Sequence, residues 1–349
     1  EIIQMKKRVV GFFGKQENDN VHLFVVLADD SEGKLYVSSA IFPPEIKEYE
    51  SLTQELPSFH MFEREFYEEF NIKPLNHPWL KSVRNHKNKY EFFEMKGDEI
   101  HQVAVGPIHA GVIEPGHFRF MCCGEKIYEL EIQLGWQSKG VEQLFLTSHS
   151  NRLAESVCGD SVVAYNIAYS NLVESLSGCE ITNKAQLIRL IALEMERCAI
   201  HIGDLGAIAG DIAYLMGASI FGATRTLVIN TMLEISGSRF ARGLIETGGV
   251  NYDIDLALSD KIVSVLDKVS NDVERTVKTM LKSPTVASRL EKTGIVSKET
   301  AIEMGFTGMT ARASGVNLDT RFDHPDKWYK DIENRSTKAD GDVYSRTRL

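Results

Sequence analysis

The stretch Asn151–Leu176, NRLAESVCGDSVVAYNIAYSNLVESL, carries the periodicity that decides the fold of this 349-residue chain. Apolar or small residues recur at helical spacing along it, namely Leu153, Val157, Ser161, Tyr165, Ala168, Leu172 and Leu176. This spacing places them on one face of an α-helix, which Ser177-Gly178 then ends. The stretch therefore predicts a helix whose apolar stripe faces a core.

The helical pattern continues towards the C-terminus. Asn183 is expected to cap a second helix that runs past Arg197 to about Asp204. Further helical patterns cover Ile212–Thr226, Leu227–Ser236 and Asp260–Leu281. The most apolar stretch, Ile212–Thr224, falls short of the roughly 20 apolar residues that span a bilayer. The sequence therefore predicts that the chain has no transmembrane segment of its own.

Upstream of these helices the hydrophobic period is that of β-strands. The runs HLFVVLA and KLYVSSAIF flank the turn-forming residues Asp29–Gly33 and predict a β-hairpin over Val21–Ile41. After Pro43-Pro44, Glu45–Leu56 has helical spacing. A second set of strands is expected at Val103–Val105, His117–Cys122 and Glu125–Leu134. Vicinal Cys122-Cys123 in this set indicates only packing.

The switch in period predicts an α+β protein with two domains. A small N-terminal α+β domain is expected at residues 1–97. A mainly helical domain with a small β-sheet at its start is expected at residues 98–349. A chain of this length exceeds what one hydrophobic core usually serves, which agrees with two domains.

The overall composition argues against some kinds of binding partner. The formal net charge is −10, and no dense cluster of Lys and Arg offers a basic face to nucleic acid. Residues Glu1–Arg8 lack the order of a secretory signal, so a cytoplasmic location is expected. The five cysteines are odd in number and scattered, so no disulfide framework is implied.

A charged and aromatic run, EREFYEEFNI at Glu63–Ile72, is followed by Asn76-His77-Pro78 and Arg84. On physical grounds alone it is the solvated end of an amphipathic helix. The run closely resembles the signature of the C-type subunit family of bacterial NADH:quinone oxidoreductase. In that family it is a docking and structural element without a cofactor.

The loop Gly106–Phe120, GPIHAGVIEPGHFRF, combines imidazoles and a carboxylate with small residues. Such a loop could approach a cofactor closely and pass protons, or it could be a surface hairpin loop with incidental histidines. It resembles the opening of the large subunit of formate-hydrogenlyase-type hydrogenases, and its GPxH is shared with the D-type subunit of complex I. The resemblance implies catalytic roles for His109 as pocket wall and Glu114 as proton relay, where nickel or quinone receives electrons.

The segment ESVCGDSVVAY contains Cys158 and Ser161. Two thiolates at i and i+3 on a helix can chelate one soft metal, which is the role of the CxxC pair in hydrogenase large subunits. Here Ser161 occupies the second position, and a lone cysteine is also a common small hydrophobe. The resemblance to hydrogenases covers Cys158 only, and both Cys158 and Ser161 are expected to border a cofactor. The second CxxC pair of hydrogenase large subunits is also absent before Leu349, so this chain is expected to hold no nickel–iron centre firmly.

Two further segments support the family. GMTARASG at Gly308–Gly315 and DTRFDHP at Asp319–Pro325 look like its RASG and DxRxxxP segments, and Arg312 is assigned to cofactor binding on this basis. Helical spacing also aligns Glu194, Arg197, His201 and Asp204 in one polar stripe. This stripe is either an exposed face or, by the resemblance, a buried ion network.

The resemblance implies a hydrophilic large subunit of a membrane-bound electron-transfer complex, peripheral on the inner face of the cell membrane. Electrons would come from an iron–sulfur cluster in a small partner subunit like the B-type subunit of complex I, because the chain has no GxGxxG and no Walker lysine. Integral-membrane ion-pumping subunits would be the other partners. Two alternatives stay open, a catalytically decayed scaffold subunit and an active nickel–iron hydrogenase with ligands outside this chain.

Overall fold

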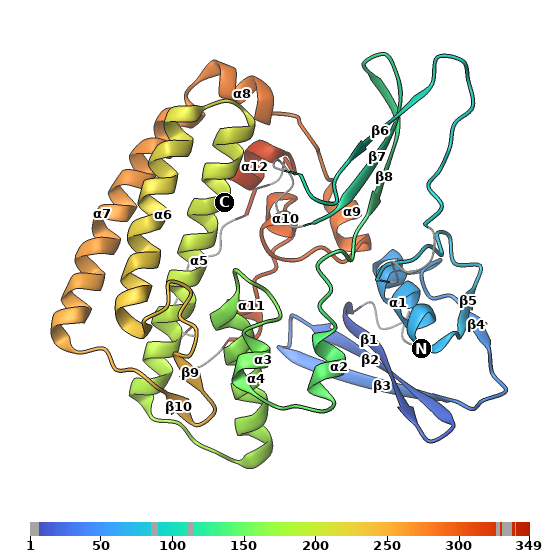
Figure 1. The fold of residues 1–349 in the computed structure, drawn as a ribbon, viewed down its shortest axis with the longest axis horizontal. Coiled ribbons are helices and arrows are strands. Elements are labelled where there is room, and N and C mark those ends of the chain that lie inside the picture. The colour runs from blue at the N-terminus through green and yellow to red at the C-terminus, as the bar shows by residue number, and fades with distance from the viewer. Residues whose placement is uncertain (1–6, 85–89, 110–114, 326–328, 330–336, 339) are drawn as a thin grey trace. The chain divides into compact units, whose positions relative to one another are not determined.

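The computed structural model describes residues 7–84, 90–109, 115–325, 329, 337–338 and 340–349. The chain divides into two compact units. Unit 1 comprises residues 1–138 and 294–349, and unit 2 comprises residues 139–293. Most strands belong to unit 1 and the long helices to unit 2, which confirms the α+β class (Figure 1). The boundary expected at residue 97 lies inside unit 1 and stays a prediction.

An antiparallel sheet in the order β1-β2-β3 opens unit 1. Its strands are β1 (Arg8–Glu17), β2 (Asn20–Asp29) and β3 (Lys34–Phe42). The predicted hairpin is confirmed, whereas β1 was not predicted. Alternate residues of the sheet, including Phe12 and Leu23, are buried together with Phe59 and Phe66, which lie beside α1 and within it. The core of this part of unit 1 therefore lies between the sheet and α1.

The helix predicted for Glu45–Leu56 is wrong. This segment contains β4 (Glu48–Glu50), which pairs in parallel with β5 (Lys73–Leu75). The 3₁₀ helix η2 (Pro57–Phe59) and α1 (His60–Phe70) follow β4. Leu56 precedes a proline and has non-helical backbone angles, so a helix cannot continue through it into η2. The side chain of Tyr49 packs edge-on against Phe42 and Phe66 instead.

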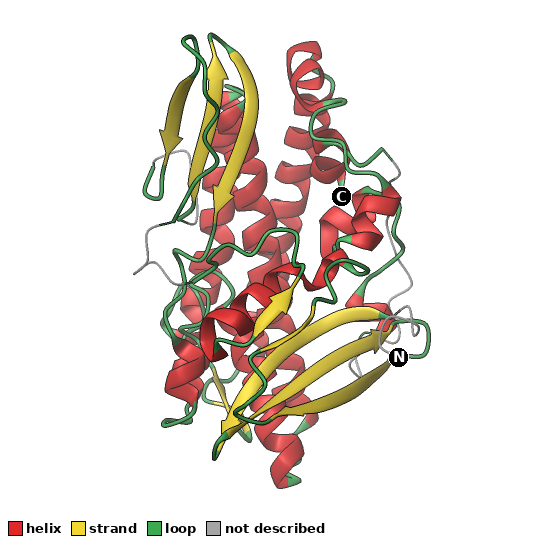
Figure 2. Cartoon of the chain, turned by 90° about the vertical axis from the view of Figure 1, so that its right-hand side faces the viewer, coloured by secondary structure: helices red, strands yellow, loops and turns green. Residues whose placement is uncertain are grey.

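A second antiparallel sheet in unit 1 confirms the other predicted strands (Figure 2). It contains β6 (His101–Val105), β7 (His117–Cys123) and β8 (Lys126–Gln133). Short helices complete the unit, namely α9 (Lys298–Glu303), α10 (Gly308–Ala313), α11 (Thr320–Asp323) and α12 (Val343–Arg348).

Unit 2 is built on three long helices that lie side by side (Figure 1). They are α5 (Asn183–Asp211), α6 (Leu215–Ser236) and α7 (Leu256–Leu281), accompanied by α2 (Val141–Phe145), α3 (Asn151–Ala154), α4 (Val162–Ser177), α8 (Pro284–Leu290) and the hairpin of β9 (Ile245–Glu246) and β10 (Gly249–Val250). In the described part of the chain, no helix has both the length and the apolar character needed to cross a membrane.

Several predicted helix bounds in unit 2 need correction. The cap of α5 is Thr182, whose hydroxyl accepts the Ala185 N–H at 3.2 Å, so the expected Asn183 cap is wrong. The helix also runs beyond Asp204 to Asp211. The two helices expected over Ile212–Ser236 are the single helix α6, because no Pro or Gly interrupts the sequence near Leu227.

The helix predicted for Asn151–Leu176 is interrupted, since residues 155–161 separate α3 from α4. Its apolar stripe also faces outwards, with Leu172 58% and Leu176 81% exposed. The buried face of α4 is partly polar, because Asn166, Ser170 and Glu174 point inwards with Val162 and Val163. Hydrogen bonds to partners elsewhere in unit 2 satisfy these polar groups, so the polar side can be the inner one.

Candidate functional site

The turn at residues 155–161 of unit 2 holds both residues that were predicted to border a cofactor. Cys158 is half-buried, and Ser161 occupies the N-cap position of α4. Because α4 begins only at Val162, Cys158 and Ser161 are not on one helix, and the predicted helical presentation is wrong. The Ser161 side chain makes no capping hydrogen bond. The first N–H groups of α4 therefore depend on another acceptor.

That acceptor is Glu196 of α5. Its carboxylate oxygens accept the N–H groups of Val163 at 2.7 Å and Ala164 at 3.0 Å, and the residue is only 5% exposed. Burial, with a smaller contribution from the negative charge of Asp160, raises the pKa of Glu196 to about 7 against the lowering effect of the backbone N–H groups at the start of α4. Its environment therefore favours the protonated form more than that of an exposed glutamate does.

Glu196 is the residue of this site that sequence reasoning missed. The predicted polar stripe selected Glu194 two positions earlier. A usable signal was present, because Glu196 follows Ala192 by four residues and precedes Ala199 by three, and both alanines lie on the buried face of α5. An acidic residue at a core position of an amphipathic helix marks a carboxylate with a specific partner.

The other end of the turn is held by Glu155. Its carboxylate accepts the Asn166 side-chain amide at 3.0 Å and the Gly243 N–H at 2.7 Å. The Arg242 guanidinium donates to the Glu155 carbonyl at 3.2 Å. Since Glu196 holds the first turn of α4, the Cys158 turn is fixed on both sides by buried carboxylates.

The polar stripe on α5 has the expected residues but not the deep burial of an internal ion network. Glu194 and Arg197 form an ion pair whose side chains are 31% and 41% exposed. Burial raises the pKa of Asp204, while the positive charges of His201 and Arg225 lower it and Asp160 raises it. Asp160 thus acts electrostatically on both Glu196 and Asp204.

The remaining predicted site residues belong to unit 1. His109 is exposed and follows β6, and Glu114 lies outside the described residues. Arg312 of α10 is mostly buried and forms an ion pair with Asp319 at 3.4 Å. Asp319 also accepts from Arg321 at 2.7 Å, so the two C-terminal motifs are joined to each other. The functional roles of His109, Glu114 and Arg312 stay predictions.

A thiolate-bound nickel centre does not fit the donor set of the Cys158 turn. Ser161 stands at the second position of the family pair, and a neutral alcohol is a weak ligand for a soft metal. Among the residues that the structure describes, no group of three or more His, Cys, Asp or Glu side chains converges as metal ligands would. The described groups at this turn are the Cys158 thiol and the carboxyl groups of Glu155, Asp160 and Glu196, so the thiol is the one soft donor among them.

The charged run at Glu63–Ile72 is a structural clamp within unit 1. Fully buried Glu63 accepts from the N–H groups of Leu52 and Thr53 at 2.9 and 3.0 Å. Arg64 donates to the carbonyls of Lys81 and Ser82 at 2.6 and 3.1 Å. The interpretation as a solvated helix end is therefore wrong. These contacts fit the structural role that the resemblance implies.

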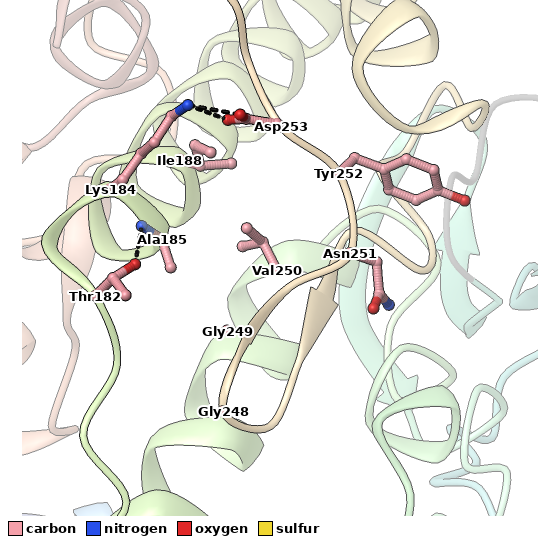
Figure 3. Close-up of a pocket in the computed structure, with 10 residues that line it drawn as sticks. All are labelled: Thr182, Lys184, Ala185, Ile188, Gly248, Gly249, Val250, Asn251, Tyr252 and Asp253. Atoms are coloured by element: carbon pink, nitrogen blue, oxygen red, sulfur yellow. Dashed lines mark hydrogen bonds and ion pairs between the residues drawn. The ribbon is translucent and has the colours of Figure 1, made fainter.

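A cavity of about 350 Å³ with mixed polar and apolar walls lies between the start of α5 and the β9–β10 hairpin (Figure 3). Lys184 and Asp253 are the only charged side chains among its ten described lining residues. They form an ion pair with each other at 2.6 Å. Their charges neutralise each other, so the cavity has no net charge with which to attract an ionic ligand.

A larger cavity of about 670 Å³ lies in unit 1, between the ends of β1 and β2 and residues 302–318. Its walls are mixed, with Leu56 and Phe306 among the apolar residues. Arg8 in its wall forms an ion pair with Asp30 at 2.7 Å, and Asp30 also contacts the His324 ring at 2.9 Å. These charged groups are used to join the sheet to the C-terminal segment.

Comparisons with known proteins agree with the family resemblance of the sequence motifs. Residues 211–349 match the family described as respiratory-chain NADH dehydrogenase, 49 Kd subunit. The membrane-bound hydrogenase subunit alpha of Pyrococcus furiosus is 31% identical over 70% of the chain and 60% of its own length. The chain is thus similar to hydrogenase large subunits and to the D-type subunit of NADH-quinone oxidoreductase, and its residues 211–349 contain the domain of that family. The resemblance found in the sequence motifs is thereby confirmed.

Two other relatives show how much of the chain this family covers. Formate hydrogenlyase subunit 5 of Escherichia coli is 27% identical over 97% of the chain and 66% of its own length. The D-type subunit of NADH-quinone oxidoreductase from Thermosipho melanesiensis is 27% identical over 70% of the chain and 70% of its own length. The chain thus spans between 60 and 66% of the hydrogenase relatives named here.

Proposed function

We propose that the chain is the hydrophilic large subunit of a membrane-associated oxidoreductase complex of the hydrogenase and complex I type. It passes electrons from an iron–sulfur cluster in a small partner subunit to an acceptor at the Cys158 turn. The observation that carries this proposal is the turn itself, which is fixed by Glu155 on one side and by Glu196 on the other. Fixed groups position an acceptor better than mobile ones.

The side chains around the turn suit a reaction that consumes protons with electrons. Glu196 has a pKa of about 7, so it can hold a proton or give one up at neutral pH with little energetic cost. The half-buried Cys158 thiol would contact the acceptor. The roles of His109 as pocket wall and Glu114 as proton relay are part of the proposal and rest on the resemblance.

The test is an assay of the complex purified from membranes, with hydrogen evolution and quinone reduction measured in parallel. Cys158→Ser is compared with Cys179→Ser, which changes an exposed cysteine just beyond the other end of α4. We expect Cys158→Ser to lower one of the two activities at least about tenfold, as loss of a group at the reacting centre does. Equal activities for both variants and the unmodified complex would contradict the proposal.

A second candidate function is a scaffold that couples electron input to an ion-pumping membrane module without an acceptor of its own. Ser161 at the family's thiolate position is the observation that favours it. In that case Cys158→Ser leaves both activities unchanged. Deleting the subunit would then abolish assembly of the complex, as expected for a part needed only for its contacts.

A further inference from the structure

Helix α4 has no N-cap of its own, and Glu196 supplies one from a neighbouring helix. In unit 2, the helices α3, α5 and α7 begin with Ser150, Thr182 and Asp255, and each of these side chains accepts an N–H group of its own first turn. Ser161 makes no such bond. The two Glu196 oxygens accept the N–H groups of Val163 and Ala164 in its place.

A cap of this kind changes with the protonation of the carboxyl group. An ionised carboxylate has two acceptor oxygens and can hold both N–H groups, and the N-terminus of the helix favours its negative charge. A protonated carboxyl group carries a hydrogen on one oxygen and loses strength as an acceptor there. Uptake of a proton by Glu196 therefore weakens one of the bonds to Val163 or Ala164.

The groups around Glu196 determine the pH at which its carboxylate takes up a proton. Burial and the charge of Asp160 raise its pKa to about 7, against the lowering effect of the N–H groups of Val162, Val163 and Ala164. Other titratable or charged groups lie on the turn, on α5 and on α6, namely Glu155, Cys158, Arg197, Cys198, His201, Asp204 and Arg225. Both forms of Glu196 are consequently populated at neutral pH.

We propose that Glu196 is a proton-responsive positioning residue of the Cys158 turn. Its carboxylate anchors the first turn of α4, directly after Ser161, and a bound proton releases part of this anchor so that the turn loosens. The thiol of Cys158 then becomes more accessible. This inference rests on the proposed function for the view that the acceptor sits at this turn, and it adds a means by which proton delivery changes the geometry of that site.

The test measures the thiol rather than the activity, so it is independent of the proposed function. The native protein is treated with iodoacetamide between pH 6 and 8, and the alkylation rates of the Cys158 and Cys179 peptides are compared by mass spectrometry. Exposed Cys179 corrects for the general effect of pH on thiols. We expect the Cys158 to Cys179 rate ratio to rise roughly threefold from pH 8 to pH 6 as the cap bond weakens.

Two variants serve as comparison. Glu196→Gln mimics the protonated form, so its rate ratio should stay at the low-pH value across the whole range. Glu194→Gln removes the same charge from the same helix at a half-exposed position and should follow the unmodified protein. Equal pH profiles for Glu196→Gln and the unmodified protein would overturn the proposal.

A second measurement needs no variant and covers the case in which Glu196→Gln fails to fold. Hydrogen exchange of the Val163 and Ala164 amides is followed in the native protein and corrected for the intrinsic effect of pH. Their protection should rise between pH 6 and pH 8 as the Glu196 carboxylate ionises. Protection that is constant over this range would show that the cap does not respond to protonation.

Discussion

The carboxylate of Glu174 on α4 lies 2.7 Å from the guanidinium of Arg189 on α5, and both side chains are buried. Arg189 also donates to the carbonyls of Glu246 and Gly249 at 2.8 and 2.9 Å, and the Gly248 N–H donates to Glu174 at 2.8 Å. Burial works to raise the pKa of Glu174, but Arg189 and the Gly248 N–H outweigh it and hold the pKa below its ordinary value. The pair thus joins two helices to the β9–β10 hairpin.

Removal of one partner of this pair is therefore expected to be costly. Arg189→Met leaves the Glu174 carboxylate buried without its cation and should lower the free energy of unfolding of unit 2 by about 3–5 kcal/mol. Lys184→Met at the exposed Lys184–Asp253 pair should cost far less, because solvent screens an exposed ion pair. Urea unfolding followed by hydrogen exchange in α4 and α5 measures both values. Similar losses in the two variants would contradict the expectation.

Glu63 has the corresponding role in unit 1. Besides two N–H groups it accepts the hydroxyls of Ser51 and Thr53, at 2.7 and 2.5 Å. Glu63→Gln places an amide N–H₂ opposite some of these donors and leaves them unsatisfied in a buried place, which should cost about 2–3 kcal/mol. Glu65→Gln, which loses a partly exposed ion pair with Arg84, is the matched control and should cost under about 1 kcal/mol. Thermal unfolding of the two variants tests the difference.

The elements of the fold that the sequence predicted correctly are those whose pattern is local. Strands β2 and β3 alternate on both sides of a recognisable turn, and Gly178 ends α4 with left-handed backbone angles as expected. The orientation of α4 was wrong because its inner face depends on partners far away in sequence. Asn166 contacts Asn151 and the carbonyl of Ile245, and no periodicity within α4 reveals such contacts.

The candidate site was also predicted only in part. Cys158 and Ser161 were found because a short motif identifies them, and the structure places them in one turn. Glu196 was missed because the N–H groups that it caps belong to residues 32 and 33 positions earlier in the chain. The sequence shows that a carboxylate is present at position 196, but not which helix N-terminus it contacts in the folded chain.

The outward apolar stripe of α4 gives a direct test of this corrected orientation. The double change Leu172→Ser and Leu176→Ser affects exposed side chains and should alter the free energy of unfolding of unit 2 by less than about 1 kcal/mol. Val228→Ala on α6, at a fully buried position, should cost about 1–3 kcal/mol. Urea unfolding measures both. A larger loss for the leucine pair than for Val228 would favour an inward-facing leucine stripe.

The stability of the two units should respond to pH in opposite directions. Burial lowers the pKa of His60 and of His77, with further lowering by Arg64, so unfolded histidines bind protons more readily and unit 1 loses stability as pH falls through about 6.5. Burial raises the pKa of Glu196, so the native form binds more protons, and the global free energy of unfolding of unit 2 rises as pH falls from about 7 to its ordinary value of 4.5, although the local bonds to Val163 and Ala164 weaken.

Hydrogen exchange resolved by peptide can separate the two effects. The His77 ring accepts the Trp79 N–H through Nδ1 at 3.1 Å, and a proton on that nitrogen would break the bond. Replacing both histidines by Gln should therefore flatten the acid response of unit 1 and leave that of unit 2 unchanged. Parallel pH profiles for the two units would contradict the sign argument.

The last prediction concerns nickel at the Cys158 turn. A thiolate nickel site needs several soft ligands from at least two segments, and Ser161 removes one of the pair that the family uses here. An alcohol gives up its proton only to a metal that is already strongly bound, so the affinity should fall well below that of a four-thiolate site. We expect elemental analysis of the purified complex to find nickel far below one equivalent, with a higher content in Ser161→Cys than in the size-matched control Ser156→Cys. Near-equimolar nickel in the unmodified protein would overturn this expectation, because it would require ligands beyond the residues that the structure describes.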